Sequence, residues 1–347
     1  MKKSLFLAVV LLGLHFSSIA QEEKGPPPAR GVIIKWALGY TWSGSVKSEY
    51  VQNLNTDLKN PLVDAFVNMA NSSDADGSYK PIHTTYGQGL NVSFRIGYMF
   101  NPYIGFDVGV TYSQSADISS TQLHYLYLPD STGVLQPSGG YLNCQLSSSA
   151  RSVSVSPSII AAFAKPKFKF YPYVRIGLTL PVWTQVTQKI GIDLVDIGPD
   201  PNAPYFIGTR TDITIETKVK FAIGFNAAFG VVYKPAPFMG LFFELTGQYL
   251  NLQAKSSEIT QWDADGVDLL PSRGAYRNQF NYVSSLTGTS NNAQVNSNYN
   301  PNQPKDDISY KIPYSNLGFN LGIQLIINKS IYNDGNPKKK RVKQISK

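Results

Sequence analysis

The chain has 347 residues, of which 42% are hydrophobic and 16% are charged, and its formal net charge is +8. Its one cysteine, Cys144, excludes a framework of intrachain disulfides and a cysteine-rich metal site. The positive charge sits at the two ends of the chain, so that residues 21–337 carry no net formal charge. A basic surface for nucleic acid is therefore excluded, and no nucleic-acid partner is expected.

Residues 1–20 are predicted to be a secretory signal peptide. A pair of lysines precedes an apolar run over residues 5–16, and Ser18-Ile19-Ala20 fits a small-x-small cleavage site. The run is shorter than the roughly 20 apolar residues of a membrane-spanning helix. Residues 21–30, with three consecutive prolines, are expected to form a stiff periplasmic lead-in.

Strict alternation of residue types marks the segment from Gly89 to Ser113. Large apolar side chains fall on one parity, and small or polar ones, including Arg95 and Asp107, fall on the other. Since side chains of a β-strand alternate faces with period 2, the segment is predicted to be a hairpin with a turn at Asn101-Pro102. A soluble sheet would bury its apolar face in a core, whereas a membrane barrel turns that face to lipid.

The same alternation recurs along the chain and predicts eight strands in all. Their ranges are 34–42, 89–100, 104–113, 153–163, 173–182, 219–233, 241–249 and 317–327. The connections after the second, fourth and sixth strands are short, while those at 44–88, 118–150, 191–211 and 261–311 are long. Short turns at one end and long loops at the other are typical of outer-membrane barrels. A lipocalin-like soluble barrel is the structural alternative, but it would turn polar residues outward.

We therefore predict an all-β fold: an eight-stranded antiparallel transmembrane β-barrel over residues 31–329, with short periplasmic turns and four long extracellular loops. An even strand count places both termini in the periplasm of a Gram-negative bacterium. Aromatic residues near the short turns predict a girdle at the membrane interface. The patterns around 168–190, 212–235 and 239–260 exceed the 9–11 residues needed to span, so these strands are expected to project beyond the outer leaflet.

Two of the long loops carry local signals. Asn60-Pro61 before an apolar stretch predicts a short surface helix in the first loop. The fourth loop is rich in asparagine, serine and threonine around 287–303, a composition that buries little apolar surface. Disorder or mobility is expected there.

The chain resembles the Bacteroidota-type outer-membrane β-barrel protein family, which is related to OmpA-like and OmpX-like eight-stranded barrels. The residues that carry the resemblance are RIGY at 95–98, NPYIGFDVGVTY at 101–112, PYVRIG at 172–177, GLFFELTGQY at 240–249 and NLGIQLII at 320–327. The last of these resembles the signal of a closing strand, although the chain continues twenty residues beyond it. The resemblance covers about 31–329 and implies a fold and a membrane, not an activity.

Polar residues on the inward parity are the candidate site. An eight-stranded barrel leaves an interior just wide enough for side chains, and charges buried there must pair. The expected charge network comprises Lys35, Arg95, Asp107, Arg175, Lys220 and Glu244. The polar residues expected beside it are Asn91, Asn226, Gln248, Asn320 and Gln324. Such a network is a structural plug, or alternatively a gate whose charges re-pair to open a small pore.

Catalysis and metal binding find less support in the sequence. Some barrels of this size modify lipid A with a histidine near the outer rim. Only His83 and His124 remain after removal of the signal peptide, and His124 is the only plausible base. No spacing supports a triad, so no catalytic residue is expected. Asp193, Asp196 and Asp200 could offer oxygen ligands to calcium, but they lack a defined loop pattern, so no metal and no cofactor is expected.

Residues 330–347 are predicted to be a free basic periplasmic tail, with its charge at Lys338, Lys339, Lys340, Arg341 and Lys343. The tail could rest on anionic headgroups or dock a periplasmic protein. The function that the sequence favours is non-enzymatic: surface structure, loop-mediated binding, or membership in an outer-membrane assembly. A narrow channel for a small solute is the alternative, and a lipid-modifying enzyme is third. The expected partners are outer-membrane lipid, including lipopolysaccharide, and an outer-membrane or periplasmic protein.

Overall fold

The computed structural model describes residues 31–43, 84–129, 135–163, 170–195, 209–236 and 238–328. The predicted signal peptide, the lead-in, the helix after Asn60-Pro61 and the basic tail lie outside these residues. No helix in the described part of the chain is long and apolar enough to cross a membrane.

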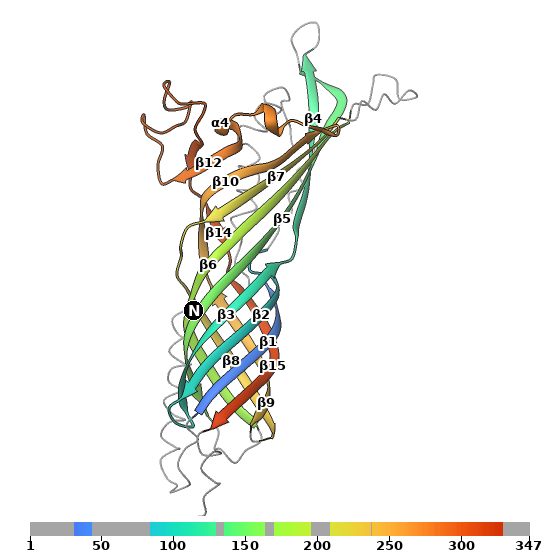
Figure 1. The fold of residues 1–347 in the computed structure, drawn as a ribbon. Coiled ribbons are helices and arrows are strands. Elements are labelled where there is room, and N and C mark those ends of the chain that lie inside the picture. Colours follow the sequence, from blue (N-terminus) through green and yellow to red (C-terminus); the bar gives the residue numbers. More distant parts are fainter. Residues whose placement is uncertain are drawn as a thin grey trace, which may run out of the picture.

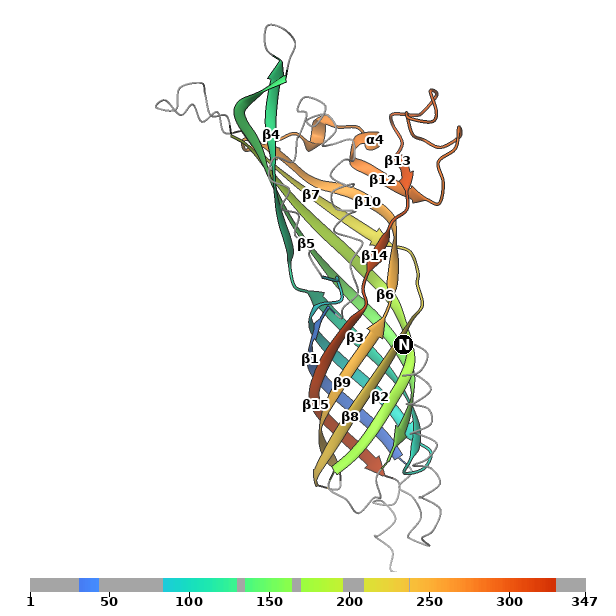
Figure 2. The same cartoon turned by 180° about the vertical axis from the view of Figure 1, so that it is seen from behind.

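Eight antiparallel strands close into a barrel (Figures 1 and 2). Around the barrel these strands are β1 (Gly31–Trp42), β2 (Gly89–Met99), β3 (Ile104–Ser115), β5 (Leu135–Ala162), β6 (Phe170–Val195), β8 (Gly224–Ala236), β9 (Met239–Tyr249) and β15 (Asn316–Asn328). The last strand pairs with the first along its whole length, from Gly31↔Asn328 to Trp42↔Leu317. This pairing removes both edges of the sheet and confirms the predicted eight-stranded barrel.

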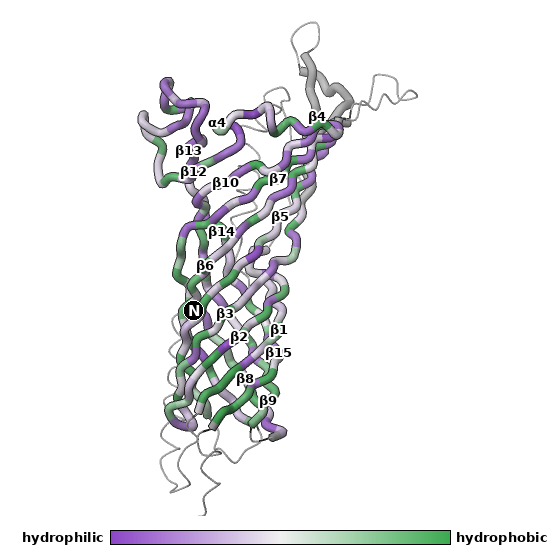
Figure 3. Tube along the Cα trace, viewed as in Figure 1, coloured by the Kyte–Doolittle hydropathy of each residue, from purple (hydrophilic) through white to green (hydrophobic). Residues whose placement is uncertain are grey.

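The barrel turns its apolar face outward. In β2, Leu90, Val92 and Ile96 are exposed, whereas Asn91, Ser93 and Arg95 on the opposite parity are buried. Figure 3 shows the resulting alternation of hydrophobic and hydrophilic positions along the barrel strands. Aromatic rings pack on the outer surface, for example Trp36 against Phe94 at 5.4 Å between ring centroids. An apolar outer face with a polar interior is the arrangement of a membrane barrel and the reverse of a soluble one.

Beyond the barrel, β5 and β6 continue side by side and carry further strands of the same sheet, here named the extension (Figure 1). Its further strands are β4 (Ile118–Pro129), β7 (Thr209–Val219), β10 (Asn251–Ala264), β12 (Gln279–Val283) and β13 (Lys305–Ile308). The strand order across the extension is β4-β5-β6-β7-β10-β12-β13, and only the last pair is parallel. Short elements complete it: β11 (Val267–Asp268), β14 (Lys311–Pro313), the 3-10 helix η1 (Leu270–Ser272) and the helix α4 (Ala275–Asn278).

The extension has an apolar core of its own. Leu146 and Val186 from the long strands pack with Leu252 and Ile259 of β10 and with Phe280 of β12. A second, smaller core lies inside the barrel near the short turns. The extension is therefore a folded unit and not a set of separate loops.

The structure corrects the predicted loops. Residues 118–150, 191–211 and 261–311 were expected to connect barrel strands, but parts of all three segments form strands of the extension. The predicted strand at 219–233 is also wrong at its start, because β7 ends at Val219 and β8 begins at Gly224. Phe221 and Ile223 continue the apolar alternation through the break, and both are exposed. The pattern alone therefore could not show where the strand stops.

The asparagine-rich stretch of the fourth loop also differs from the expectation of disorder, because side-chain amides organise it. The Asn291 Nδ2 group donates to the carbonyl oxygens of Asn300, Gln303 and Pro304, while its Oδ1 accepts from the Asn300 backbone N–H. Asn292 is buried and donates to the Asp306 carbonyl at 2.8 Å. Satisfied polar groups replace an apolar core here, which composition alone does not reveal.

Candidate functional site

The first part of the site is a buried ion pair between neighbouring strands. Arg95 of β2 donates from Nε and Nη2 to the two carboxylate oxygens of Asp107 on β3, at 3.0 and 2.6 Å. The same Nη2 also reaches the Ser156 carbonyl and the Ser158 hydroxyl of β5. A guanidinium and a carboxylate that pair at two points satisfy each other in a space that excludes water.

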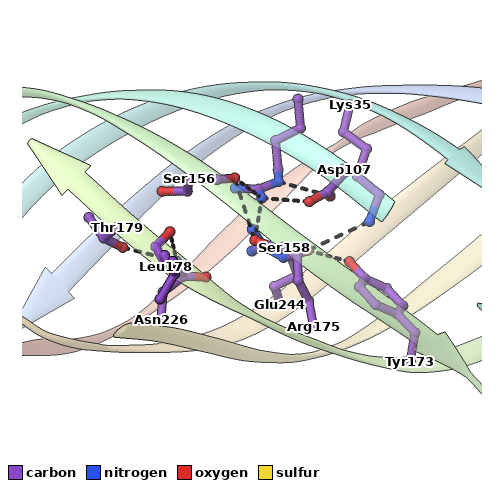
Figure 4. A network of polar contacts seen from close by, with 11 residues as sticks. Lys35, Asp107, Ser156, Ser158, Tyr173, Arg175, Leu178, Thr179, Asn226 and Glu244 are labelled. Carbon is purple, nitrogen blue, oxygen red and sulfur yellow. Dashed lines mark hydrogen bonds and ion pairs between the residues drawn. The ribbon is translucent and has the colours of Figure 1, made fainter. Parts of the chain in front are cut away.

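A second carboxylate gathers the remaining lumenal charges (Figure 4). Glu244 of β9 accepts from Arg175 Nη2 at 2.8 Å and lies 3.7 Å from Lys35 Nζ. The Tyr173 hydroxyl donates to Glu244 Oε1. The Lys35 ammonium lies 4.0 Å from the centroid of the Tyr173 ring. Glu244 is thus held by side chains from two other strands, β1 and β6.

Glycines on the inward face make room for these side chains. A methyl group at Gly109 would overlap the Arg95 guanidinium, and one at Gly230 would come within 2.6 Å of the Tyr173 ring. The small residues on the polar parity therefore leave the space that the long charged side chains cross. We name the five charged residues and Tyr173 the plug: Lys35, Arg95, Asp107, Tyr173, Arg175 and Glu244.

Beyond the plug, toward the extension, lies a polar cavity of about 80 Å³ that we name the chamber. Among the residues that line it are the predicted Asn91, Asn226, Gln248 and Asn320. Asn226 donates to the Leu178 carbonyl and the Thr179 hydroxyl, at 2.8 and 2.9 Å. Three buried polar atoms of its lining residues have no hydrogen-bond partner among the described residues: Arg175 Nε, Asn226 Oδ1 and Asn320 Oδ1.

Tyr86 and Tyr314 form a cap at the other end of the chamber. Tyr86 and Tyr314 are buried and belong to the core of the extension, and Tyr314 also lines the chamber. The Tyr86 hydroxyl shares a 2.5 Å hydrogen bond with Ser148, and the Tyr314 hydroxyl shares one of 2.8 Å with Ser113. The segment that carries Tyr86 is tied to β1, because Thr41 Oγ1 donates to the Gly87 carbonyl at 2.6 Å. Buried side chains of the described residues thus occupy the lumen at two levels, the plug and this cap.

On the short-turn side of the plug the lumen is apolar. A cavity of about 90 Å³, the vestibule, is lined by Ile33, Val232 and Ile326 together with the predicted Gln324. Lys234 stands at this end with its ammonium 3.8 Å from the centroid of the Tyr171 ring. Not all aromatic residues near the short turns join the predicted girdle: Tyr171 and Tyr173 are buried in the lumen, whereas Phe170 and Tyr233 pack together on the outer face.

The structure places Lys220 outside the charge network, so that prediction is wrong. Lys220 lies in the break between β7 and β8, and its ammonium is 3.4 Å from the Ser309 hydroxyl in the extension. The error follows from reading residues 219–233 as one strand. The sequence reasoning also missed Ser156 and Ser158, although both stand on the inward parity of their strand and could have been found by it.

The alternative sites are only partly described. Asp193 lies 3.5 Å from Arg210, while Asp196 and Asp200 are outside the described residues. Within the described part of the chain, no group of three or more histidine, cysteine or acidic side chains could hold a metal ion. His83 is outside the described residues, and of His124 only the backbone, on β4, is described.

Comparison with known proteins identifies the family. A comparison with curated proteins finds no match. Among solved structures, Acinetobacter baumannii CarO2 matches with 10% identity and a TM-score of 0.27, over 87% of this chain and 100% of that one, and at this score the likeness carries no conclusion. The family model described as "Outer membrane protein beta-barrel domain" matches residues 6–241. Because that match spans more than half of the chain, and the strands close into an eight-stranded barrel, the chain belongs to the outer membrane protein β-barrel domain family.

Proposed function

We propose that this outer-membrane protein is a closed, non-enzymatic barrel that presents the extension at the cell surface as a binding platform. The observation that carries the proposal is the apolar core of the extension, built from β5, β6, β10 and β12. Ordinary connections between barrel strands need no core of their own. A core of this kind keeps the surrounding surface in one shape, as recognition of a partner requires.

The edges of the extension supply groups for a partner. Among the described strands, β4 pairs only with β5, and β13 pairs only with β12. An edge strand offers unpaired backbone N–H and C=O groups, and an added strand from another protein is one recognised way to satisfy them. This favours a protein partner, either a ligand at the surface or a subunit of an outer-membrane assembly.

The proposed orientation follows from the two ends of the barrel. Short turns join β2 to β3 and β8 to β9 at one end, and the extension rises from the other. In barrels of the outer membrane, short turns face the periplasm, so both termini are placed there and the extension outside. The apolar outer face is then in contact with membrane lipid, including lipopolysaccharide. We also propose the Bacteroidota-type assignment, on the residues at 95–112 and 172–177 that resemble that group.

A narrow channel is the second candidate, because the vestibule and the chamber lie on opposite sides of a single layer of ion pairs. Re-pairing of Glu244 would have to join them, and the cap would have to open as well. Conductance of Glu244→Ala and Arg95→Ala in planar bilayers tests this candidate, with the exposed Glu258→Ala as the control. Silence of all three variants removes the channel, whereas steady current from the first two alone supports it.

The proposed absence of enzymatic activity rests on the sequence, where His124 is the one plausible base. Mass spectra of lipid A from cells that produce the wild-type chain or His124→Ala address it. Identical spectra, equal to those of cells without the protein, are expected. A mass change that depends on His124 would replace the proposal with a lipid-modifying enzyme.

The platform itself is tested in cells of the native host. Thr260→Cys places a thiol on the exposed face of β10, and Phe238→Cys places one beside the short turn before β9. A membrane-impermeant maleimide should label the first on intact cells and the second only after the outer membrane is permeabilised. A photo-crosslinker at 260 should then yield an adduct of discrete mass that one at 238 does not. Reversed labelling, or no adduct from 260, would overturn the proposal.

A further inference from the structure

The buried charges of the plug do not balance. Lys35, Arg95 and Arg175 are three cations, while Asp107 and Glu244 are two carboxylates, and all five side chains are at most 6% exposed. Within the plug one positive charge is therefore in excess. Lys234 at the end of the vestibule adds a further positive charge and not a compensating one. An uncompensated charge in so narrow a space is costly, so something should neutralise it.

Two of the plug's cations, Arg95 and Arg175, border the chamber. Arg175 gives only its Nη2 to Glu244, and its Nε is buried with no hydrogen-bond partner. The residues that line the chamber with these two arginines include Ser93, Thr111 and Ser154. Guanidinium N–H and hydroxyl groups are donors, which is the composition that an anion requires.

We propose that the chamber binds one small inorganic anion of the size of chloride or bromide. Its negative charge would offset the excess cation, and the orphaned Arg175 Nε would become a donor to it. A cavity of about 80 Å³ also leaves space for water, which can serve the unpartnered amide oxygens of Asn226 and Asn320. Between the plug and the cap, a larger or polymeric anion has no room.

A neutral Lys35 is the competing way to remove the excess charge, and it predicts that no anion is bound. A direct test is thermal unfolding of the purified full-length protein in detergent, in sodium chloride or bromide against sodium gluconate at the same ionic strength. Bound halide stabilises the folded state alone, so Tm should rise with halide concentration to a plateau, by about 2 °C or more. An equal Tm in the three salts would overturn the proposal.

A matched pair of variants locates the effect. Ser93 is buried on β2, pairs in register with Ala37 and Thr111, and lines the chamber. Ser93→Asp supplies a fixed negative charge in place of the ion, so its Tm should no longer depend on halide. Ser93→Asn is similar in size and uncharged, and should keep the dependence. Equal dependence in both variants would contradict a chamber site.

A second measurement uses the wild-type protein and can therefore be made even if Ser93→Asp fails to fold. Crystals of the wild-type protein grown in bromide should show an anomalous difference peak in the chamber, within hydrogen-bond distance of Arg175 Nε. Density for water alone at that position, with no anomalous signal, would overturn the proposal.

Discussion

Arg95 and Asp107 meet across a diagonal of the β2–β3 hairpin because each faces a glycine in the strand register. Arg95 is opposite Gly109, and Asp107 is opposite Gly97. The two glycines leave the lumen open between the strands, so the guanidinium can lie flat against both carboxylate oxygens. In each of these two register pairs, a charged side chain lies opposite a glycine, and this arrangement sets the geometry of the ion pair.

Removal of one partner from this ion pair should be far more damaging than the same change at the surface. Asp107→Ala leaves the Arg95 guanidinium buried and unpaired, which should lower the free energy of unfolding by about 3–5 kcal/mol. The control is Asp212→Ala, which breaks an exposed pair with Arg210 and should cost about 1 kcal/mol or less. Urea titration of the protein in detergent measures both. Equal losses would show that the buried pair has no special role.

The glycine opposite Arg95 should not tolerate a side chain. Gly109→Ala would push the guanidinium away from Asp107, with an expected loss of about 1–3 kcal/mol. In Gly247→Ala the added methyl would meet only Leu317 Cδ2, at 3.3 Å, so little change is expected. The two variants are compared by their unfolding midpoints. A similar midpoint for both would mean that the plug can rearrange freely.

Cys144 should be inert in the folded protein. It is buried in the core of the extension, and this burial, with a smaller contribution from the Asp193 carboxylate, raises the pKa of its thiol to about 11. The reactive thiolate is therefore scarce at pH 7–8 and becomes abundant only as the pH approaches that value. N-ethylmaleimide at pH 7.5 should modify Cys144 only after denaturation. The exposed Ser119→Cys should react within the same period in the folded protein, and rapid modification of the wild type would contradict the buried core.

Asn291 should hold the fourth loop together. Asn291→Ala removes the amide that binds three carbonyl oxygens between Asn300 and Pro304, so the loop should open to protease. Asn302→Ala changes an exposed asparagine of the same stretch and is the control. Limited proteolysis followed by mass spectrometry should place new cuts within 284–304 in the first variant only. Identical digestion patterns would argue against this role.

Much of the barrel follows from the sequence for a physical reason. Lipid selects a bulky apolar side chain at every second position, so the alternation at Leu90–Phe100 and Ile104–Tyr112 directly reports the outer face. The inward parity likewise predicts that four charged residues face the lumen together: Arg95, Asp107, Arg175 and Glu244. Their pairing depends on the register between strands, and no single strand carries that information.

The extension was less predictable because nothing there imposes such a pattern. In β4 and the upper part of β5, polar and apolar residues alternate loosely, and the partner strands are distant in sequence. The sequence does not show that β7 ends at Val219, because Phe221 and Ile223 continue the apolar alternation although they lie in no strand. The order of the asparagine-rich stretch rests on side-chain amides bonded to specific carbonyls, which composition cannot show.

The central claim is that the lumen is closed, by the plug at one level and by the cap around Tyr86 and Tyr314 at another. Single-channel recording of the purified wild-type protein in planar lipid bilayers, in about 1 M potassium chloride, tests it most directly. Heat-modifiable migration on gels shows that the inserted protein is a folded barrel. The account predicts no resolvable current steps from folded, inserted protein. Reproducible steps of uniform conductance would contradict it, because ions would then be crossing a lumen that these residues are said to seal.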